Sequence, residues 1–289
     1  MKNFSVVVCT YNRHNLVERC LKNILANTLL PNKIIVVDQN LNFLTRDKII
    51  NFFKNNNFKN YIIIRNLDKR GLTKSKNISL KYICTKYVFF IDDDIMIKNN
   101  YFYENIKLLF KKKGHGSSGV MSNYKSGSIN DFFYYIFNYN LFKDNRYYFK
   151  NYKKLRKKKT FSKVYQLPGG MTCFDSKIFK KIIFDEKFII HNYEDVEFNI
   201  RLRSQYENLK LFINFNTSVE DSLNKNFKEN IFMRFYYLRL IYLKNRNLKL
   251  FFYYYLSLTG LIVSNLLKLS KKDYLKIYEF LKKADKKIN

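Results

Sequence analysis

Phe89-Phe-Ile-Asp-Asp-Asp94 joins a run of large apolar side chains to three consecutive carboxylates. Two earlier segments, Ser5-Val-Val-Val-Cys-Thr-Tyr-Asn-Arg13 and Ile34-Ile-Val-Val-Asp38, also have the pattern of apolar strands that end on polar groups, and an acidic cluster follows at Tyr193-Glu-Asp-Val-Glu197. A buried strand that delivers polar groups at its end is how an open α/β sheet builds a ligand site. Because three adjacent aspartates repel one another, we expect a divalent cation, Mg²⁺ or Mn²⁺, to bind beside them.

Strand-like and helix-like patterns alternate over the first third of the chain. This alternation predicts an α/β fold with right-handed crossovers and a parallel sheet, whose ligand site lies at the carboxyl ends of the strands. Residues 114–130 are rich in Gly and Ser and are expected to form a loop or a short edge strand flanked by turns. The expected strands are 4–9, 33–37, 60–65 and 86–91, and the expected helices are 14–27, 43–56 and 71–84.

The charge balance is strongly basic, with 54 Lys and Arg residues against 23 Asp and Glu residues and a formal net charge of +31. Such an excess favours anionic surfaces and polyphosphates, and it raises the alternative of a nucleic-acid-binding protein. We do not expect nucleic acid as a partner, because the chain has no base-reading motif and the aspartate triplet would repel phosphates. The four cysteines have no metal-type spacing, which predicts reduced thiols. The N-terminus enters a strand at once, which predicts a cytoplasmic location.

The chain resembles the family 2 glycosyltransferases, which are inverting nucleotide-sugar enzymes, over roughly residues 4–220. Each matching motif is weak alone, but together and in this order they are specific. The resemblance implies an α/β GT-A fold, Rossmann-like with a mostly parallel sheet flanked by helices, and a glycosyltransferase of the EC 2.4 class. The matching segments are Val8–Arg13, Asp38, Asn66–Asn77, the aspartate triplet, Pro168-Gly-Gly170, Phe184-Asp-Glu186 and Glu194–Arg201.

The resemblance implies a site for a UDP- or dTDP-sugar donor at the ends of the first strands. Asp38 is expected to accept a hydrogen bond from the N3–H of uracil or thymine, since a charged acceptor makes a stronger bond. Lys76 stands where the family has an Arg and lacks its bidentate fork, so Arg70 is expected to share the pyrophosphate contact. The expected nucleotide-sugar-binding residues are Thr10, Tyr11, Asn12, Arg13, Asp38, Arg70, Lys76, Asp92 and Asp93.

The same resemblance assigns the metal ligands. Asp92 and Asp94 are expected to hold the Mg²⁺ or Mn²⁺, and Asp93 can take over either role because the register of a triplet is ambiguous. Many relatives carry a His as a third metal ligand after the general base. This chain has no His there, so Asp221 or Glu220 is expected to replace it, or a water completes the metal shell.

An inverting transfer needs one carboxylate to deprotonate the acceptor hydroxyl, and the resemblance gives this role to Asp195, at the start of a predicted helix. Glu197 lies on the same helical face as Glu194 and either supports the site or faces water, and Arg201 is spaced to pair with it. The expected acceptor-binding residues are Glu194, Gly169, Gly170 and His191.

The C-terminal region is predicted to be helical, basic and aromatic, and separate from the catalytic core. Its stretch 250–267 is uncharged, contains several polar residues and has the minimum length for a spanning helix. Its basic and aromatic surroundings favour peripheral docking on an anionic membrane surface. A spanning or hairpin insertion and a buried core or homo-oligomer helix are the alternatives. The predicted parts are a catalytic domain at 1–225, its nucleotide-binding half at 1–98, its acceptor half at 99–225 with a basic insertion at 131–163, and the extension at 226–289.

These expectations describe an enzyme that moves a hexose or deoxyhexose from a UDP- or dTDP-sugar, with inversion, to a glycan or lipid-linked acceptor during cell-surface polysaccharide synthesis. It would lie at the inner face of the cytoplasmic membrane. The alternatives are a basic nucleic-acid-binding protein and an inactive family member that only binds the donor.

Overall fold

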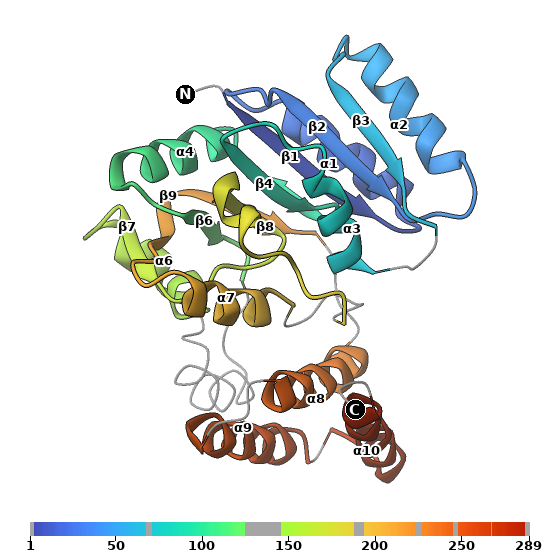
Figure 1. Cartoon of the computed structure of the whole chain (residues 1–289), viewed down its shortest axis with the longest axis vertical. Helices are drawn as coiled ribbons and strands as arrows, with labels where there is room; N and C mark the ends of the chain where they lie inside the picture. The colour runs from blue at the N-terminus through green and yellow to red at the C-terminus, as the bar shows by residue number, and fades with distance from the viewer. Residues whose placement is uncertain are drawn as a thin grey trace.

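A computed structural model describes residues 3–67, 71–124, 146–187, 194–222, 227–244, 248–266 and 268–286. Figure 1 shows an α/β domain above a group of C-terminal helices. The domain contains a nine-stranded mixed sheet with the order β3-β2-β1-β4-β8-β6-β9-β5, and β7 pairs with β9.

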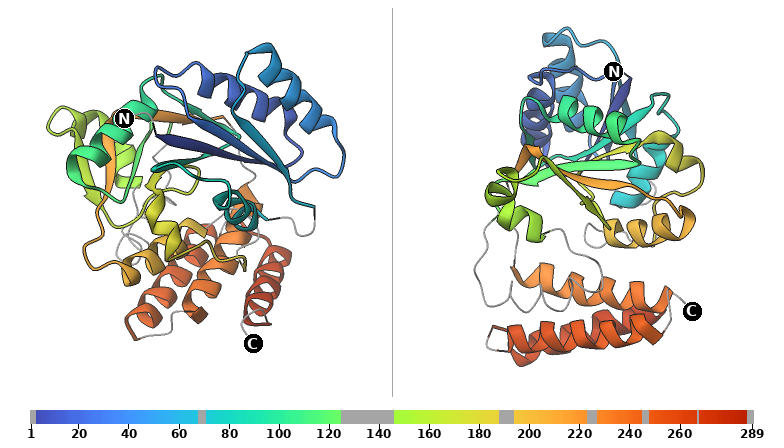
Figure 2. Two further views of the ribbon diagram at one scale, coloured as in Figure 1. Left: turned by 45° about the horizontal axis from the view of Figure 1, so that its top comes forward. Right: turned by 90° about the vertical axis from the view of Figure 1, so that its left-hand side faces the viewer.

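The N-terminal half of the sheet is parallel, as predicted. β1 (Phe4–Thr10), β2 (Lys33–Asp38), β3 (Tyr61–Arg65) and β4 (Tyr87–Asp92) pair in parallel, and their connecting helices are α1 (His14–Leu25), α2 (Leu44–Asn55) and α3 (Leu72–Leu80). Figures 1 and 2 show α1 and α2 on one face of these strands and α3 on the other. The register pairs Thr10 with Asp38 and Cys9 with Asp92, so the polar strand ends meet at one edge.

The second half of the sheet is largely antiparallel. It contains β5 (Ile95–Ile97), β6 (Gly116–Met121), β7 (Phe161–Val164), β8 (Met171–Asp175) and β9 (Leu211–Asp221). β8 pairs with β4 and therefore brings the residues just before it, Gly169 and Gly170, to the end of β4. The accompanying helices are α4 (Tyr101–Lys112), α6 (Arg146–Arg156), the 3₁₀ helix η1 (Ser176–Lys180) and α7 (Glu194–Gln205).

The prediction of a loop or edge strand at 114–130 is wrong for the residues that form β6, because β6 lies between β8 and β9 inside the sheet. Its small residues serve close packing rather than turns. A Cβ at Gly119 would come within 2.7 Å of the Tyr101 ring and 2.9 Å of the Thr217 carbonyl oxygen. Residues 125–145, which include the first part of the predicted insertion, lie outside the described residues. Its remainder contributes α6 and β7, which pack on the sheet.

The C-terminal region is helical, as predicted, and its helices are α8 (Phe227–Lys244), α9 (Leu248–Asn265) and α10 (Lys271–Lys286). They form their own apolar cluster, separate from the core of the sheet, and Val196 of α7 belongs to it. Tyr242 stacks on Tyr254 and Phe232 stacks on Phe280, so α8 packs against both neighbours. Within the described ranges, the helices lack the combination of length and apolar character that crossing a bilayer requires.

Candidate active site

The aspartate triplet begins with Asp92, the last residue of β4, and continues with Asp93 and Asp94, which are both buried in the turn that leads to β5. Asp93 accepts hydrogen bonds from the Thr10 hydroxyl at 2.8 Å and from Arg13 Nη1 at 3.1 Å, and the same nitrogen lies 3.4 Å from Asp94. Burial raises the pKa of Asp93 against these two partners. Two predicted donor residues, Thr10 and Arg13, therefore hold one carboxylate of the triplet in place.

The oxygen donors beside the triplet fit a hard cation. The backbone N–H of Ser222 donates to the Asp94 carbonyl at 3.0 Å, so β9 ends with Asp221 beside the triplet. Glu220 points to the opposite face of β9 and accepts from the Ser122 hydroxyl, which favours Asp221 over Glu220 as the third ligand. Among the described residues there is no group of three or more acidic, His or Cys side chains arranged to hold a metal ion. Mg²⁺ commonly binds one or two protein carboxylates together with substrate phosphates, so this small donor set suits it.

Asp38 is fully buried at the end of β2. Its Oδ1 accepts from the backbone N–H and the side-chain amide of Asn40, at 3.0 and 2.5 Å. Its Oδ2 has no hydrogen-bond partner in the part of the chain that the structure describes. Burial raises the pKa of Asp38 above its usual value, although the Asn40 hydrogen bonds and the charge of Arg65 oppose this. A buried acceptor with one free oxygen is what the predicted contact with a base N3–H requires.

Arg65 is a site residue that sequence reasoning missed. Its guanidinium lies 4.0 Å from the centre of the Phe43 ring and donates to the Leu41 carbonyl at 2.8 Å, which fixes the loop after Asp38. Asn12 adds to this loop, because its N–H donates to Asn40 Oδ1 at 2.6 Å from a left-handed backbone with φ of 54°.

The structure describes only one of three further residues that were predicted to bind the sugar donor or the sugar acceptor. Tyr11 is exposed after β1. Arg70 and His191 lie outside the described residues, so their predicted roles stay predictions.

Gly169 and Gly170 connect the triplet to the predicted base. A Cβ at Gly170 would lie only 1.9 Å from Asp92 Oδ2, and the backbone N–H of Asp92 donates to the Gly170 carbonyl at 2.8 Å. A Cβ at Gly169 would lie 2.7 Å from Glu194 Oε1 and 3.2 Å from the Cβ of Asp195. The absence of side chains at both positions therefore lets the end of β4 and the start of α7 approach one backbone segment.

Asp195 has the electrostatic properties of a general base. It lies in the first turn of α7, where its Oδ2 accepts from the Gly169 N–H at 3.1 Å and its Oδ1 accepts from the Val196 N–H at 2.8 Å. Burial, and then the neighbouring charge of Glu194, raises the pKa of Asp195 to about 7, although Lys76 and these two hydrogen bonds oppose the shift. A carboxylate with a pKa near neutrality holds and releases a proton efficiently at physiological pH.

Lys76 lies beside the predicted acceptor residues. It is buried, and its Nζ donates to the Gly169 carbonyl at 3.1 Å and lies 3.4 Å from Glu194 Oε1. Burial lowers the pKa of Lys76, but the charges around it, above all those of Glu194 and Asp92, outweigh burial and raise the pKa. The structure thus gives Lys76 a role in joining α3 to α7, whereas its predicted pyrophosphate contact stays a prediction.

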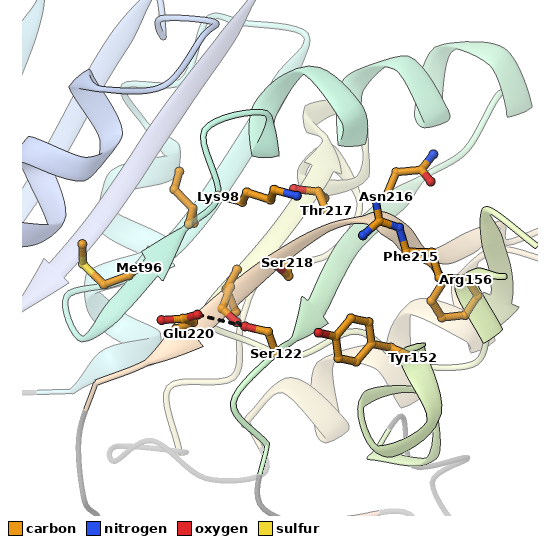
Figure 3. Close-up of a pocket in the computed structure, with 12 residues that line it drawn as sticks. Met96, Lys98, Ser122, Tyr152, Arg156, Phe215, Asn216, Thr217, Ser218 and Glu220 are labelled. Carbon is orange, nitrogen blue, oxygen red and sulfur yellow. Dashed lines mark hydrogen bonds between the residues drawn. The ribbon is translucent and has the colours of Figure 1, made fainter. Parts of the chain in front are cut away.

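A separate cavity of about 420 Å³ lies among β5, β9 and α6 (Figure 3). Glu220 and Ser122 form one side of it, and the Tyr152 hydroxyl points towards Ser122 from α6. Apart from Glu220, the residues that line it are not among the predicted site residues. The predicted site is thus formed by the strand ends and the glycine segment rather than by this cavity.

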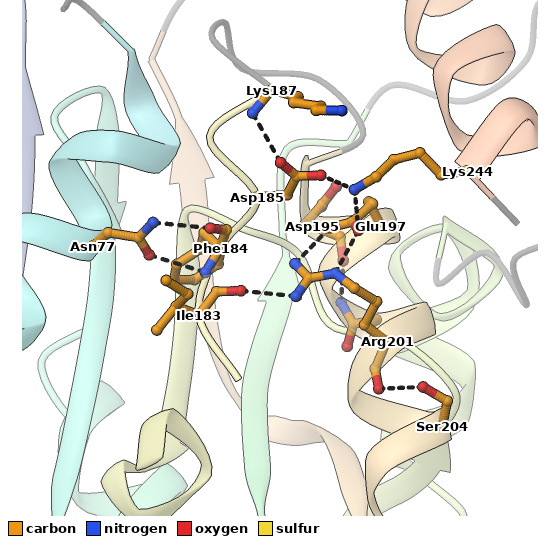
Figure 4. A network of polar contacts seen from close by, with 11 residues as sticks. Asn77, Ile183, Phe184, Asp185, Lys187, Asp195, Glu197, Arg201, Ser204 and Lys244 are labelled. Atoms are coloured by element: carbon orange, nitrogen blue, oxygen red, sulfur yellow. Dashed lines mark hydrogen bonds and ion pairs between the residues drawn. The ribbon is translucent and has the colours of Figure 1, made fainter. Parts of the chain in front are cut away.

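A buried ionic network holds α7 in place (Figure 4). Glu197 is only 1% exposed, and both of its oxygens accept from the guanidinium of Arg201, as the i,i+4 spacing predicted. Lys244, at the end of α8, pairs with Glu197 at 3.1 Å and also with Asp185. Arg201 further donates to the Ile183 carbonyl at 2.9 Å. Glu197 therefore supports the site instead of facing water, and sequence reasoning gave no signal for Lys244.

Comparison with known proteins agrees with this geometry. The pattern of the family described as Glycosyl transferase family 2 matches residues 5–183. A GalNAc(5)-diNAcBac-PP-undecaprenol beta-1,3-glucosyltransferase from Campylobacter jejuni is 29% identical over 123 residues, which cover 43% of this chain and 38% of that enzyme. The match thus spans well under half of that curated relative.

Solved structures share the fold at low identity. S. aureus TarS 1-349 in complex with UDP-GlcNAc superimposes with a TM-score of 0.64 at 15% identity, over 100% of this chain and 82% of that chain. The mannosyltransferase PcManGT from Pyrobaculum calidifontis, in complex with GDP-Man and Mn²⁺, gives a TM-score of 0.63 at 12% identity, over 96% and 79%. With its α/β GT-A fold and C-terminal helices, this chain belongs to glycosyl transferase family 2.

Proposed function

We propose that the enzyme transfers a hexosyl or deoxyhexosyl group from a UDP- or dTDP-sugar to an acceptor hydroxyl with inversion at C1. The observation that carries this proposal concerns Asp195, whose pKa is raised to about 7. Asp195 contacts the same Gly169–Gly170 backbone segment that lies against Asp92. The acceptor O–H proton passes to the Asp195 carboxylate as the acceptor oxygen bonds to C1. The bond from C1 to the phosphate oxygen breaks, and the nucleoside diphosphate leaves. Asp195→Asn, argued in the Discussion, tests this step.

Mg²⁺ or Mn²⁺ would be held by Asp92 and Asp94, with Asp221 or a water as a further ligand. A bound cation would neutralise the charge that develops on the departing diphosphate. Arg13, which pairs with Asp93 and Asp94, keeps the two carboxylates from repelling each other before the cation binds.

We expect nucleotide binding to depend on the metal. UDP and dTDP should bind more tightly with Mn²⁺ than in EDTA, and Asp94→Ala should remove this difference because it deletes a hard oxygen ligand. Isothermal titration calorimetry measures both effects, and Asp47→Ala, an exposed acid on α2, is the matched control. Equal affinity in EDTA, or an unchanged metal effect in Asp94→Ala, would contradict the metal assignment.

The free oxygen of Asp38 allows a test of base recognition. In Asp38→Asn, the donors of Asn40 need the side-chain oxygen, so the amide –NH₂ takes the position of the free Oδ2. It then faces the N3–H of uracil donor to donor, and UDP should bind roughly 10-fold or more weakly, the scale of a hydrogen bond to a charged group. Cytosine N3 is an acceptor, so CDP should gain affinity relative to UDP in the same titration. If UDP affinity and the CDP/UDP ratio both stay unchanged, Asp38 does not contact the base.

The acceptor is proposed to be a lipid-linked glycan in cell-surface polysaccharide synthesis. The support is the Campylobacter relative, whose description names a glucosyl transfer to an undecaprenol-linked glycan. Glu194, Gly169, Gly170 and His191 would contact this acceptor. An enzyme with such an acceptor would work at the cytoplasmic face of the membrane, bound peripherally to anionic lipids. This location follows from the acceptor's lipid and from the net charge of +31.

A further inference from the structure

Helix α9 exposes an apolar stripe near both of its ends, with the exposed Thr259 between the two parts. The stripe follows the i, i+4, i+7 spacing of one helical face. Three of its members, Leu248, Phe252 and Leu266, are 86%, 62% and 56% exposed. The exposed apolar residues of this face are Leu248, Phe251, Phe252, Tyr255, Val263 and Leu266. Several large apolar side chains exposed on one face of a helix are typical of an interaction site.

The opposite face of α9 packs against the other C-terminal helices. Tyr254 and Leu261 are buried in the cluster shared with α8 and α10, and Ser257 and Asn265 are buried on the same side. The helix therefore has two apolar faces, of which the described residues cover one. This double-sided character explains why its sequence approaches that of a membrane span although none of the described helices qualifies as one.

Helix α10 also exposes basic and apolar side chains. Leu275 and Tyr278 are both more than half exposed, and Lys271 and Lys282 lie one turn before and after them on the same face. The Lys282 ammonium lies 4.6 Å from the centre of the Tyr278 ring. Figure 2 shows α9 and α10 together as the layer at the end of the molecule, with α8 between them and the catalytic domain. The two helices thus lie together at the end of the molecule that is farthest from the catalytic domain.

The charges on α10 and the loop before it favour an anionic partner. The exposed cations of α10 and the loop before it are Lys268, Lys271, Lys272, Lys276, Lys282, Lys283 and Lys286, and Glu279 is the exposed acid of the described helix. Asp273 is buried, and Asp285 pairs with Arg239. A second copy docked face to face would oppose lysines to lysines, whereas anionic lipid headgroups would neutralise them. Apolar side chains rimmed by Lys are typical of helices that lie in a membrane interface.

We infer that the outer faces of α9 and α10 form a docking surface for an anionic lipid bilayer, with both helices parallel to the membrane plane. The inference deepens the proposed function and rests on it, because the proposed acceptor is bound to a membrane. It places the catalytic domain on the cytosolic side of α8, with the apolar stripe of α9 among the acyl chains and the lysines of α10 among the headgroups.

The experiment is co-sedimentation of the full chain with vesicles of phosphatidylglycerol and phosphatidylethanolamine, and with phosphatidylcholine vesicles as the neutral reference. The protein should pellet with the anionic vesicles, and salt should weaken the binding. Phe252→Ser should reduce the partition constant about tenfold or more, the scale of burying one aromatic side chain. Phe110→Ser, an equally exposed Phe on α4, should leave it unchanged.

A second pair of variants tests the charges. Lys271→Gln combined with Lys272→Gln should weaken binding to anionic vesicles by more than tenfold, since each surface cation contributes about fivefold. Lys54→Gln combined with Lys59→Gln removes two exposed cations from the catalytic domain and should have no effect. Circular dichroism confirms folding, and Leu266→Ser replaces Phe252→Ser if the latter unfolds.

The outcomes separate this surface from the catalytic proposal. Equal losses in Phe252→Ser and Phe110→Ser, or no pelleting of the wild-type chain, would overturn the docking surface. Concentration-dependent dimers in analytical ultracentrifugation that Phe252→Ser abolishes would assign the stripe to a second copy and overturn it too. UDP titrations are run on the same variants. Intact nucleotide binding without vesicle binding refutes the surface alone, and vesicle binding without nucleotide binding refutes the catalytic proposal alone.

Discussion

Asp195→Asn is expected to reduce sugar transfer by about 10²–10⁴-fold, the usual contribution of a general base. The amide keeps the size of the side chain, but its single oxygen can accept from only one of the Gly169 and Val196 N–H groups, and it cannot take the acceptor proton. Nucleotide affinity should stay nearly unchanged, because the lost interaction belongs to the transition state. Initial rates with UDP- and dTDP-sugars, together with calorimetry of the nucleotides, measure both quantities.

The same carboxylate predicts the direction of the pH profile. The base acts when deprotonated, and its pKa is raised to about 7. The wild-type rate should therefore rise as pH increases through about 7 and level off above it, and this rise should disappear from the residual rate of Asp195→Asn. Asp47→Asn serves as the matched control with a normal profile. If Asp195→Asn keeps more than about a tenth of the wild-type rate, the assignment of Asp195 as the base is refuted.

Glu197→Ala is expected to give the largest loss of stability. It removes a carboxylate that is 1% exposed and leaves Arg201 and Lys244 without their shared partner. Breaking a buried ion pair in this way typically costs 3–5 kcal/mol, and we expect about 3 kcal/mol because both cations retain some access to water. For a chain of this size that loss lowers the melting temperature by roughly 5–10 °C.

Differential scanning calorimetry tests this expectation. Glu207→Ala removes an exposed acid just after the same helix and should change stability by no more than about 0.5 kcal/mol. If the melting temperature of Glu197→Ala falls no further than that of Glu207→Ala, the network of Figure 4 does not stabilise the fold.

The parallel half of the fold was predictable because each element carries its own periodic pattern. β1, β2 and β4 are apolar runs that end on polar residues, and parallel pairing then brings Thr10, Asp38 and Asp92 to one edge. β6 was not predictable, because Gly and Ser are usual turn residues. Their role as small residues under Tyr101 and Thr217 appears only when the sheet is assembled.

Motif spacing predicted a set of candidate site residues but not what each one contacts. Thr10 is the last residue of β1 and Arg13 lies just after it, and their described side-chain contacts are with Asp93 and, for Arg13, also with Asp94. Lys76 reaches Glu194, which lies far along the chain, through a path that no local pattern encodes. The pKa of Asp195 likewise depends on burial between separate elements, which the sequence does not display.

The contact of Lys244 with Glu197 changes how shortened versions of the enzyme would behave. A chain cut after residue 222 loses α8, and with it one of the two cations on Glu197 and the apolar cover of Val196. Both residues directly follow Asp195 in the sequence, so the first turn of α7 would loosen although every motif remains. Such a truncated protein, often made for crystallisation, should still bind nucleotide but turn over slowly. Its low rate would reflect a misplaced base rather than a missing membrane.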